Sequence, residues 1–449
     1  MKKIFQYIIL AVVTIVMASC TSDIEETTAT TGKSNVQLVV GEFPAFGDSQ
    51  TRAIGTPDAG KTSWAEGDEL LLEMTSKTLG TKYAAFTYNG SSWELTSGEL
   101  SYKEDEVPTF PHVYYAPNYK WDAGKVVLKE GKVAGTDEYI EGKANITPNG
   151  QAITVKFAEA TRNYSRLRIA TMPNKPITVS INEYTPAGSS DMKWDQNYAL
   201  TSDEKGNAYL YGTFENNSEV TVKYREAALT THTFSQATES AKSYALDATV
   251  ISANSAEEIK SAIEQKVADG KTTIRLNLAP NAGTNEFMAI REAIKGAAPN
   301  DLGTIELTII GVETIPEEAF YKMLQLKSVR MSDVKEIKKY AFKECQYLTV
   351  VEAPSLNKLY SGAFKKCDQL SKLTFGPINY ADERNWPIFE YITPNIDLIL
   401  SDYQKEMIET DDYLYTANND RDYAGSDEHN SKNFLGREFK SITCRYPVE

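Results

Sequence analysis

The chain has 449 residues, and its 47 lysines and arginines against 62 aspartates and glutamates give a net charge of −15. At roughly 150 residues per domain, this length predicts about three domains. Apolar residues make up 41% and charged residues 24%, which excludes a mostly disordered chain and a multi-pass membrane protein. An acidic chain without a basic block argues against a nucleic-acid partner. Three histidines and four cysteines leave little material for metal or nucleophile chemistry, so we expect no enzyme, no metal and no cofactor.

The N-terminus has the pattern of a lipoprotein signal. Lys2 and Lys3 precede a mostly apolar run over 4–16, which is too short for a comfortable membrane span and suits a signal peptide. Small residues before Cys20 resemble the bacterial lipoprotein signal, which implies cleavage before Cys20 and acylation of its thiol; an ordinary secretory signal is the alternative. Two or three acyl chains give stable anchoring. Residues 20–34 are rich in Thr, Ser and Glu and predict a flexible tether.

Short apolar or alternating runs separated by turn residues predict an all-β middle region. Asn89-Gly90 between two such runs is typical of a hairpin with a type I′ turn. More than ten short strands over about 215 residues favour two stacked β-sandwiches, with a break near 157–166. The expected strands are 36–40, 69–74, 82–88, 92–95, 113–116, 125–128, 153–157, 166–170, 177–182, 208–214, 220–225 and 244–247.

Residues 35–250 resemble the fimbrillin-like (Mfa-like) surface lipoproteins of Bacteroidetes. The order of several weak motifs carries the resemblance: Thr51-Arg52-Ala53, Thr62-Ser63-Trp64-Ala65-Glu66-Gly67-Asp68, 83–88 with Trp93, Tyr114-Tyr115-Ala116-Pro117, and Ser165-Arg166-Leu167-Arg168-Ile169. The resemblance implies two transthyretin-like β-sandwiches and a role in building or anchoring pili by donating a strand to a neighbour. Strand addition satisfies an open sheet edge with main-chain hydrogen bonds.

Arg52 is a candidate cleavage site. In some fimbrillins a trypsin-like protease cuts after an arginine in or just beyond the first strand, which removes the lipid and opens a groove. Arg52 follows the strand expected at 36–40, so the resemblance makes cleavage there conceivable. An unprocessed loop arginine is the alternative.

The C-terminal third carries a repeat with a period of 22 residues. Its aligned columns are Val312/Val334/Leu356, Ile315/Ile337/Leu359, Ala319-Phe320/Ala341-Phe342/Ala363-Phe364, Met323/Cys345/Cys367, Leu326/Leu348/Leu370 and Val329/Val351/Leu373. Such self-similarity predicts a leucine-rich-repeat solenoid, in which stacking of coils creates the core. The Ala-Phe pair followed by a Cys column resembles the BspA-like bacterial repeats. Cys345 and Cys367 are expected to be small buried core residues, with a disulfide as the alternative.

Three copies require caps. We expect helices at 255–268, with Ser255 as N-cap, and 286–298, strands at 273–278 and 305–310, loss of the register after Pro377, a capping strand at 396–400, a loop at 411–433 and an edge strand at 439–444. The domain organisation is therefore signal peptide 1–19, tether 20–34, β-sandwich 35–160, β-sandwich 161–250, N-terminal cap 251–310, repeats 311–376 and C-terminal cap 377–449.

If the Val329 column points inward, the neighbouring residues form an outward row that is a candidate partner-binding face: Ser328, Arg330, Val350, Glu352, Lys372 and Thr374. This row is mixed in charge and lacks aromatic rings, which favours a protein partner over a polysaccharide; a plain solvated face is the alternative.

We expect a lipid-anchored protein of the outer membrane and cell surface, or of a fimbrium, acting in adhesion or fimbria assembly. Its partners would be other fimbrial subunits or surface proteins of host or bacteria. One alternative is a polymerising pilus subunit activated by cleavage after Arg52, and another is a glycan-binding surface accessory protein.

Overall fold

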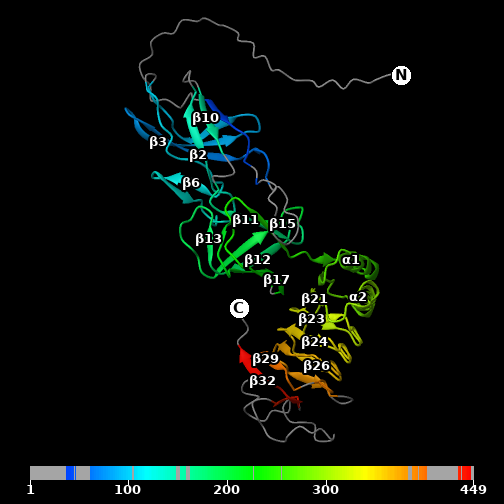
Figure 1. The fold of residues 1–449 in the computed structure, drawn as a ribbon. Helices are drawn as coiled ribbons and strands as arrows, with labels where there is room; N and C mark the ends of the chain where they lie inside the picture. The colour runs from blue at the N-terminus through cyan, green and yellow to red at the C-terminus, as the bar shows by residue number, and fades with distance from the viewer. Residues whose placement is uncertain are drawn as a thin grey trace, which may run out of the picture.

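The computed structural model describes residues 37–44, 46, 61–103, 106–147, 152–157, 162–225, 227–253, 255–382, 387–392, 394–401, 433–435 and 437–445. Cys20, Arg52, the signal peptide and the tether lie outside these residues. The fold is mainly β, with two sandwiches followed by a repeat domain, which confirms the fold class predicted from the sequence. The first sandwich and the repeat domain lie at opposite ends, with the second sandwich between them (Figure 1).

The first sandwich consists of a five-stranded sheet in the order β4-β3-β2-β5-β8 and a three-stranded sheet in the order β1-β10-β9. Leu70 and Leu72 of β2 pack with Phe86 and Ile153 between the sheets, whereas Leu71 packs on the opposite side. The strands are β1 (Gln37–Val40), β2 (Glu69–Ser76), β3 (Gly80–Tyr88), β4 (Trp93–Gly98), β5 (Val113–Tyr115), β8 (Ile140–Glu141), β9 (Lys143–Ile146) and β10 (Ala152–Lys156), with a separate hairpin β6 (Tyr119–Asp122) and β7 (Lys125–Leu128).

The hairpin predicted at Asn89-Gly90 is present, but its turn differs from the expected one. Tyr88 pairs with Trp93, so the connection has four residues instead of two. Gly90 has a φ of 93°, whereas the Asn89 side-chain oxygen accepts hydrogen bonds from the backbone N–H groups of Ser91 and Ser92. The asparagine therefore acts through its side chain, and the type I′ turn, which needs positive φ at both central residues, does not form.

The second sandwich pairs two four-stranded sheets, in the orders β13-β15-β11-β18 and β14-β12-β16-β17. Its core includes Val179, Leu210, Phe214 and Val222, all fully buried. The strands are β11 (Ser165–Ala170), β12 (Pro176–Ile181), β13 (Tyr184–Pro186), β14 (Gln196–Thr201), β15 (Asn207–Phe214), β16 (Glu219–Tyr224), β17 (Ala227–Thr233) and β18 (Ser243–Asp247).

A buried polar cluster joins the two sandwiches. Arg162 donates two hydrogen bonds to the Glu138 carboxylate, at 3.0 and 3.1 Å, and the Tyr164 hydroxyl donates to the same group. The Phe46 ring lies 4.0 Å from the Arg162 guanidinium. Because breaking a buried pair leaves an uncompensated charge, this cluster fixes the two sandwiches to each other.

The repeat domain has two parallel sheets. The large sheet contains β19 (Ile251–Ser252), β20 (Thr273–Asn277), β21 (Ile305–Ile310), β23 (Leu326–Met331), β25 (Val350–Ala353), β27 (Lys372–Phe375), β29 (Asp397–Ser401) and β32 (Ser441–Arg445), in that order. The small sheet contains β22 (Thr314–Ile315), β24 (Glu336–Ile337), β26 (Lys358–Tyr360) and β28 (Tyr380–Asp382). Near the C-terminus, β30 (Asn433–Phe434) and β31 (Arg437–Glu438) pair with each other.

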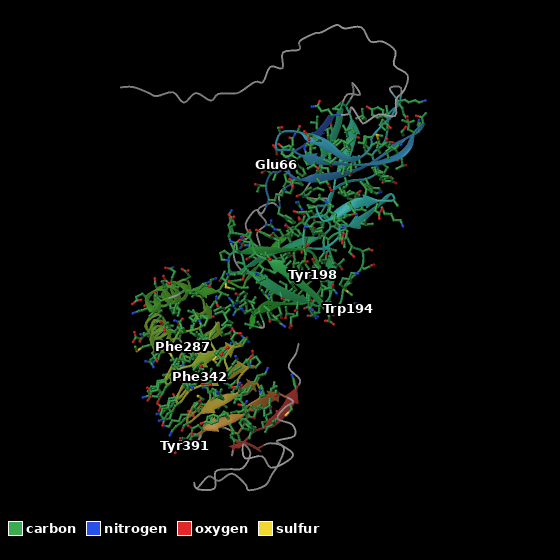
Figure 2. All side chains as sticks on the ribbon, turned by 180° about the vertical axis from the view of Figure 1, so that it is seen from behind. Glu66, Trp194, Tyr198, Phe287, Phe342 and Tyr391 are labelled. Carbon is green, nitrogen blue, oxygen red and sulfur yellow. The ribbon has the colours of Figure 1, made fainter. Side chains whose placement is uncertain are left out.

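The Phe column forms a continuous stack through the repeat domain. Ring centroids lie 5.1 Å apart for Phe320 and Phe342, 5.4 Å for Phe342 and Phe364, and 5.7 Å for Phe364 and Phe389. All of these side chains are fully buried, and Phe342 lies in the middle of the stack (Figure 2). Phe287 of α2 continues the stack on the N-terminal side, 5.6 Å from Phe320.

The helices α1 (Ala256–Ala268) and α2 (Thr284–Ala297) cap the N-terminal end, as the sequence predicts. The Ser255 hydroxyl accepts a hydrogen bond from the Glu258 backbone N–H, and this N-cap interaction starts α1 where it is expected. In the part of the chain that the structure describes, neither helix has the length and apolarity that a membrane span requires.

The expected loss of register after Pro377 is wrong. Tyr380 and Ala381 of β28 pair with Lys358 and Leu359, so the 22-residue step continues for one more coil. The sequence hides this coil because Ala381 replaces the large apolar residue of its column. The strands expected near 396–400 and 439–444 are present as β29 and β32, whereas most of the loop expected at 411–433 lies outside the described residues.

Candidate binding faces of the repeat domain

The six residues proposed for the sheet face lie on one side of the large sheet in two rows. Ser328, Val350 and Lys372 occupy adjacent positions on β23, β25 and β27. Arg330, Glu352 and Thr374 form the second row. The residues between the rows, Val329, Val351 and Leu373, are fully buried in the core, so the alternation inferred from the sequence holds.

The second sandwich covers the N-terminal end of this sheet face. Arg275 of β20 is buried and donates a hydrogen bond to the Leu229 carbonyl of β17. Ile310, at the end of β21, packs into the core of the second sandwich. The Arg275 guanidinium also lies 3.9 Å from the Asp247 carboxylate. The accessible part of the face therefore begins at β23.

Ser328 differs from the expected outward residue, because its side chain is buried. It lies between Glu306 and Val350 in its row, and its hydroxymethyl group is shorter than these neighbours. The accessible residues of the predicted face are therefore Arg330, Val350, Glu352, Lys372 and Thr374.

Charges on the sheet sides of the domain are largely paired between neighbouring coils. Arg330 contacts Glu352 at 2.9 Å, and Lys327 contacts Glu306 at 2.9 Å. On the small-sheet side, Lys335 contacts Glu313 at 2.6 Å and Lys358 contacts Glu336 at 2.7 Å. Near the end of the large sheet, a hydrogen bond from the Ser441 hydroxyl, together with Lys440, lowers the pKa of Asp397. Such exposed pairs contribute little stability each, but they leave few free charges on these sides.

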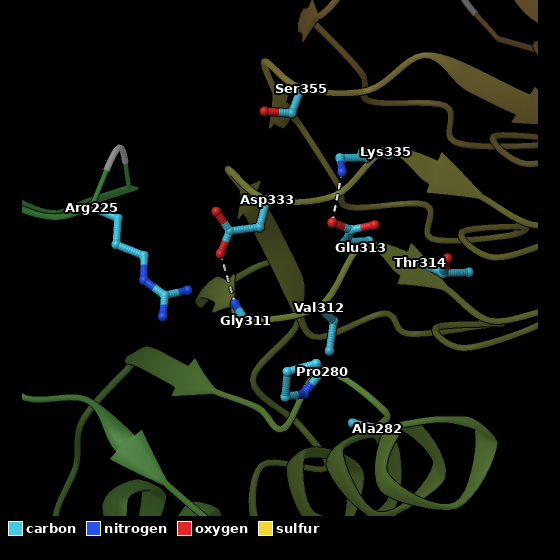
Figure 3. A pocket seen from close by; sticks show the side chains of 10 residues that line it. All are labelled: Arg225, Pro280, Ala282, Gly311, Val312, Glu313, Thr314, Asp333, Lys335 and Ser355. Carbon is cyan, nitrogen blue, oxygen red and sulfur yellow. Dashed lines mark hydrogen bonds and ion pairs between the residues drawn. The ribbon is translucent and has the colours of Figure 1, made fainter.

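A cleft of about 630 Å³ opens where the second sandwich meets the first coils (Figure 3). Arg225 reaches it from the turn after β16, opposite Asp333, which accepts a hydrogen bond from the Gly311 backbone N–H at 2.8 Å. The Lys335–Glu313 pair lies on the same wall. The sequence gave no signal for this cleft, because its walls come from two domains.

The third side of the coils, which we call the turn face, carries lysines on tyrosine rings. The Lys343 ammonium lies 5.2 Å from the Tyr321 ring and 4.7 Å from the Tyr340 ring. Lys339 lies 4.8 Å from the Tyr340 ring. Tyr391, 63% exposed, lies at the outer edge of the domain on the side away from β32 (Figure 2). These residues recur close to the 22-residue step, and that spacing is the signal that could have identified them.

Residues 302–396 match the family model described as BspA type leucine-rich repeat region, with six copies. This part of the chain is a BspA-type leucine-rich repeat region. The match starts before the predicted repeats and extends past them, in agreement with the additional coil that contains β28. No curated protein matches the chain.

Among solved structures, the minor pilin GBS52 of the Gram-positive pathogen Streptococcus agalactiae is similar over 48% of this chain and 94% of its own length, at 10% identity and a TM-score of 0.18. At that TM-score the likeness supports no argument about fold or function.

The cysteines of the leucine-rich repeats are free and buried. The Cys345 thiol donates to the Phe320 carbonyl at 2.9 Å, and the Cys367 thiol donates to the Phe342 carbonyl at 3.0 Å. Burial raises the pKa of Cys345 to about 12, which removes the thiolate needed for nucleophilic chemistry. These thiols therefore act as core residues that satisfy a carbonyl of the preceding coil.

The described histidines lie on different sandwiches. The ring of His112 contacts the Tyr114 hydroxyl at 2.9 Å and the Glu141 carboxylate at 3.3 Å. Burial lowers the pKa of His232, which lies on β17. Within the described ranges, no group of three or more His, Cys, Asp or Glu side chains is placed to hold a metal ion.

Proposed function

We propose that this chain is a cell-surface lipoprotein of fimbrillin type, anchored in the outer membrane through Cys20, that binds a protein partner through its leucine-rich repeats. The partner would be another fimbrial subunit or a surface protein of a host or bacterial cell. The proposal assigns no catalytic step and no cofactor to the chain.

The sheet face of the leucine-rich repeats carries this proposal. Arg330, Glu352, Lys372 and Thr374 are held on adjacent parallel strands, so their relative positions are fixed by the backbone hydrogen bonds of the sheet. A rigid surface reduces the entropy lost on binding. The two sandwiches lie between this face and the N-terminal side of the chain (Figure 1), which supports a stalk that presents the repeats away from an anchored Cys20.

Charge reversal on the sheet face tests the proposal. Cells that display the chain with Arg330→Glu and Lys372→Glu should lose adhesion to partner cells, because two cations of the face become anions. The matched control, Lys335→Glu with Lys358→Glu, makes the same change of charge on another side and should retain adhesion. Equal loss in both variants would refute a specific sheet face. Surface proteolysis of intact cells that leaves the repeats uncut would refute display at the surface.

A second candidate, a polymerising pilus subunit, is favoured by the position of β1. This strand lies at the edge of its sheet and pairs in parallel with β10, and Leu38 is buried against the first core. Removal of β1 by cleavage after Arg52 would expose the edge of β10 and an apolar groove for a neighbour's strand. A free N-terminus at Ala53 in the native protein, with a high-mass ladder on unboiled gels, is the expected result. A lipidated Cys20 on the intact chain, without a ladder, would refute it.

A further inference from the structure

We propose that the turn face of the leucine-rich repeats is a second binding site, which takes an anionic polysaccharide with carboxylate or sulfate groups. The site consists of Lys339, Lys343 and Lys366 with Tyr321, Tyr340 and Tyr391. It shares no residue with the sheet face and does not depend on the protein partner proposed above.

The first argument is the distribution of charge along the chain. Residues 311–376 contain 11 lysines and arginines against 8 aspartates and glutamates, whereas the whole chain has 47 against 62. The repeats are therefore a locally basic segment of an acidic protein. Because long-range fields are screened within a Debye length of about 8 Å at physiological salt, a local cluster of cations can bind an anion despite the negative net charge.

The second argument is that the lysines of the turn face are not neutralised. Four cations on the other sides, Lys327, Arg330, Lys335 and Lys358, form ion pairs with carboxylates of an adjacent coil. Within the described part of the chain, no carboxylate lies within ion-pair distance of the Lys339, Lys343 or Lys366 ammonium. These three groups keep their N–H donors available for a ligand.

The third argument is preorganisation by aromatic rings. Lys343 lies between the rings of Tyr321 and Tyr340, which come from successive coils, at 5.2 and 4.7 Å. A cation–π contact of this kind holds an ammonium in place without cancelling its charge. The order already imposed on these lysines lowers the entropy that a ligand must overcome on binding.

The fourth argument concerns the shape of the ligand. The Phe stack shows that successive coils are spaced by 5.1 to 5.4 Å in this region, so the turn face presents similar groups at regular intervals. A polymer with regularly repeated anionic groups can contact several coils at once, and such multivalency raises affinity without new types of contact. Tyr391 is 63% exposed and offers an apolar ring face, which suits a sugar ring better than an acidic peptide.

The test is binding of the full-length chain in detergent to immobilised heparin and polygalacturonate, which represent sulfated and carboxylated polysaccharides, with dextran as the neutral polymer. Binding to the anionic polymers should be strong at low salt and lost near 1 M salt, where the Debye length falls to about 3 Å. Lys339→Gln, Lys343→Gln and Lys366→Gln together should weaken binding by roughly tenfold or more. The matched control, Lys327→Gln, Lys335→Gln and Lys358→Gln together, makes the same change in net charge and should change binding less than about twofold.

Equal losses in the two triple variants would overturn the site, because they would indicate attraction to net charge alone. Absence of binding above that to dextran would also overturn it. Tyr391→Ala should weaken binding to the polysaccharides and leave binding to poly-L-glutamate unchanged, whereas equal binding of both polymers without any effect of Tyr391→Ala would assign the face to acidic peptides instead. The adhesion variants at Arg330 and Lys372 lie outside both triple variants, so the two functions can fail separately.

Discussion

The Phe stack makes the stability of the leucine-rich repeats testable through their buried thiols. Phe342 is fully buried and contacts Phe rings on both sides, at 5.1 and 5.4 Å. Replacing a buried Phe by Ala typically costs about 3–5 kcal/mol. A cost of that size at the centre of the stack should increase the population of locally opened repeats by roughly 10²–10³-fold, since about 1.4 kcal/mol corresponds to a factor of ten.

Cys345 and Cys367 report this opening. Both thiols are buried, and burial raises the pKa of Cys345 to about 12, so alkylation at neutral pH requires exposure of the thiol to water. We expect Phe342→Ala to accelerate alkylation of both cysteines by roughly 100-fold or more, when opening is in rapid equilibrium. Peptide-resolved mass spectrometry separates these sites from Cys444, which is already partly exposed.

Two further variants keep the prediction testable. Phe342→Leu preserves most of the volume, typically costs less than about 1.5 kcal/mol, and should accelerate labelling by no more than about tenfold if the alanine variant fails to fold. Tyr391→Ala removes an exposed ring of the same domain and should leave the rate unchanged. Acceleration of less than about threefold in a folded Phe342→Ala variant would refute the reasoning that the stack holds the coils together.

Three other predictions concern single interactions. Arg275→Met leaves the Leu229 carbonyl without its buried donor, which costs about 1–3 kcal/mol and should speed hydrogen exchange in β17 and β20; unchanged exchange would contradict it. The pKa of Glu106 is lowered to about 2, first by the Thr78 and Ser76 hydroxyls. Since this is below the ordinary value of 4.5, its contribution is complete above pH 4.5 and is lost as the pH falls towards 2. Loss of the Thr78 amide protection by pH 4 in an NMR titration would refute this. Gly311 has a φ of 91°, and a Cβ there would lie 2.2 Å from the Leu278 carbonyl oxygen, so Gly311→Ala should cost more than about 1 kcal/mol and speed labelling of Cys345.

The architecture of the repeats was predictable because their core positions repeat. The Ala-Phe pair and the apolar columns recur at 22 residues, and each coil must bury the same side against its neighbours. Where a column lost its large apolar residue, as at Ala381, the prediction ended one coil too early. The backbone pairing of β26 with β28 continues there because hydrogen bonds do not depend on side-chain size.

The sandwiches were predictable as strands but less so as sheets. Strands rich in apolar residues were found, whereas β9, β14 and β17, which carry many Asn, Thr or Gln residues, were not. Their position is decided by partners that are distant in the sequence, such as β16 for β17. Pairing of β1 with β10 spans more than 100 residues, and local patterns contain no information about such a partner.

The two candidate faces also differed in how well the sequence revealed them. Alternation along a strand sufficed to identify the outward row at Arg330 and Glu352, but not the burial of Ser328, which depends on the lengths of its neighbours. The turn face lies outside any strand, so its tyrosines and lysines have no period-two pattern. The cleft at Arg225 depends on the contact between two domains and has no counterpart in a local motif.

The surface columns of the repeats follow two different rules. In the columns of the sheet sides, opposite charges succeed each other at 22 residues, as for Glu313 and Lys335 or Arg330 and Glu352, and this alternation favours the correct register of the coils. On the turn face, Lys343 and Lys365 occupy the same column on successive coils, and like charges at adjacent positions are destabilising. The fold compensates Lys365 with the buried Glu390 carboxylate, at 2.5 Å, whereas Lys343 receives only tyrosine rings. A cation kept in an unfavourable column without a counter-charge is better explained by a ligand that supplies the anion than by the stability of the solenoid.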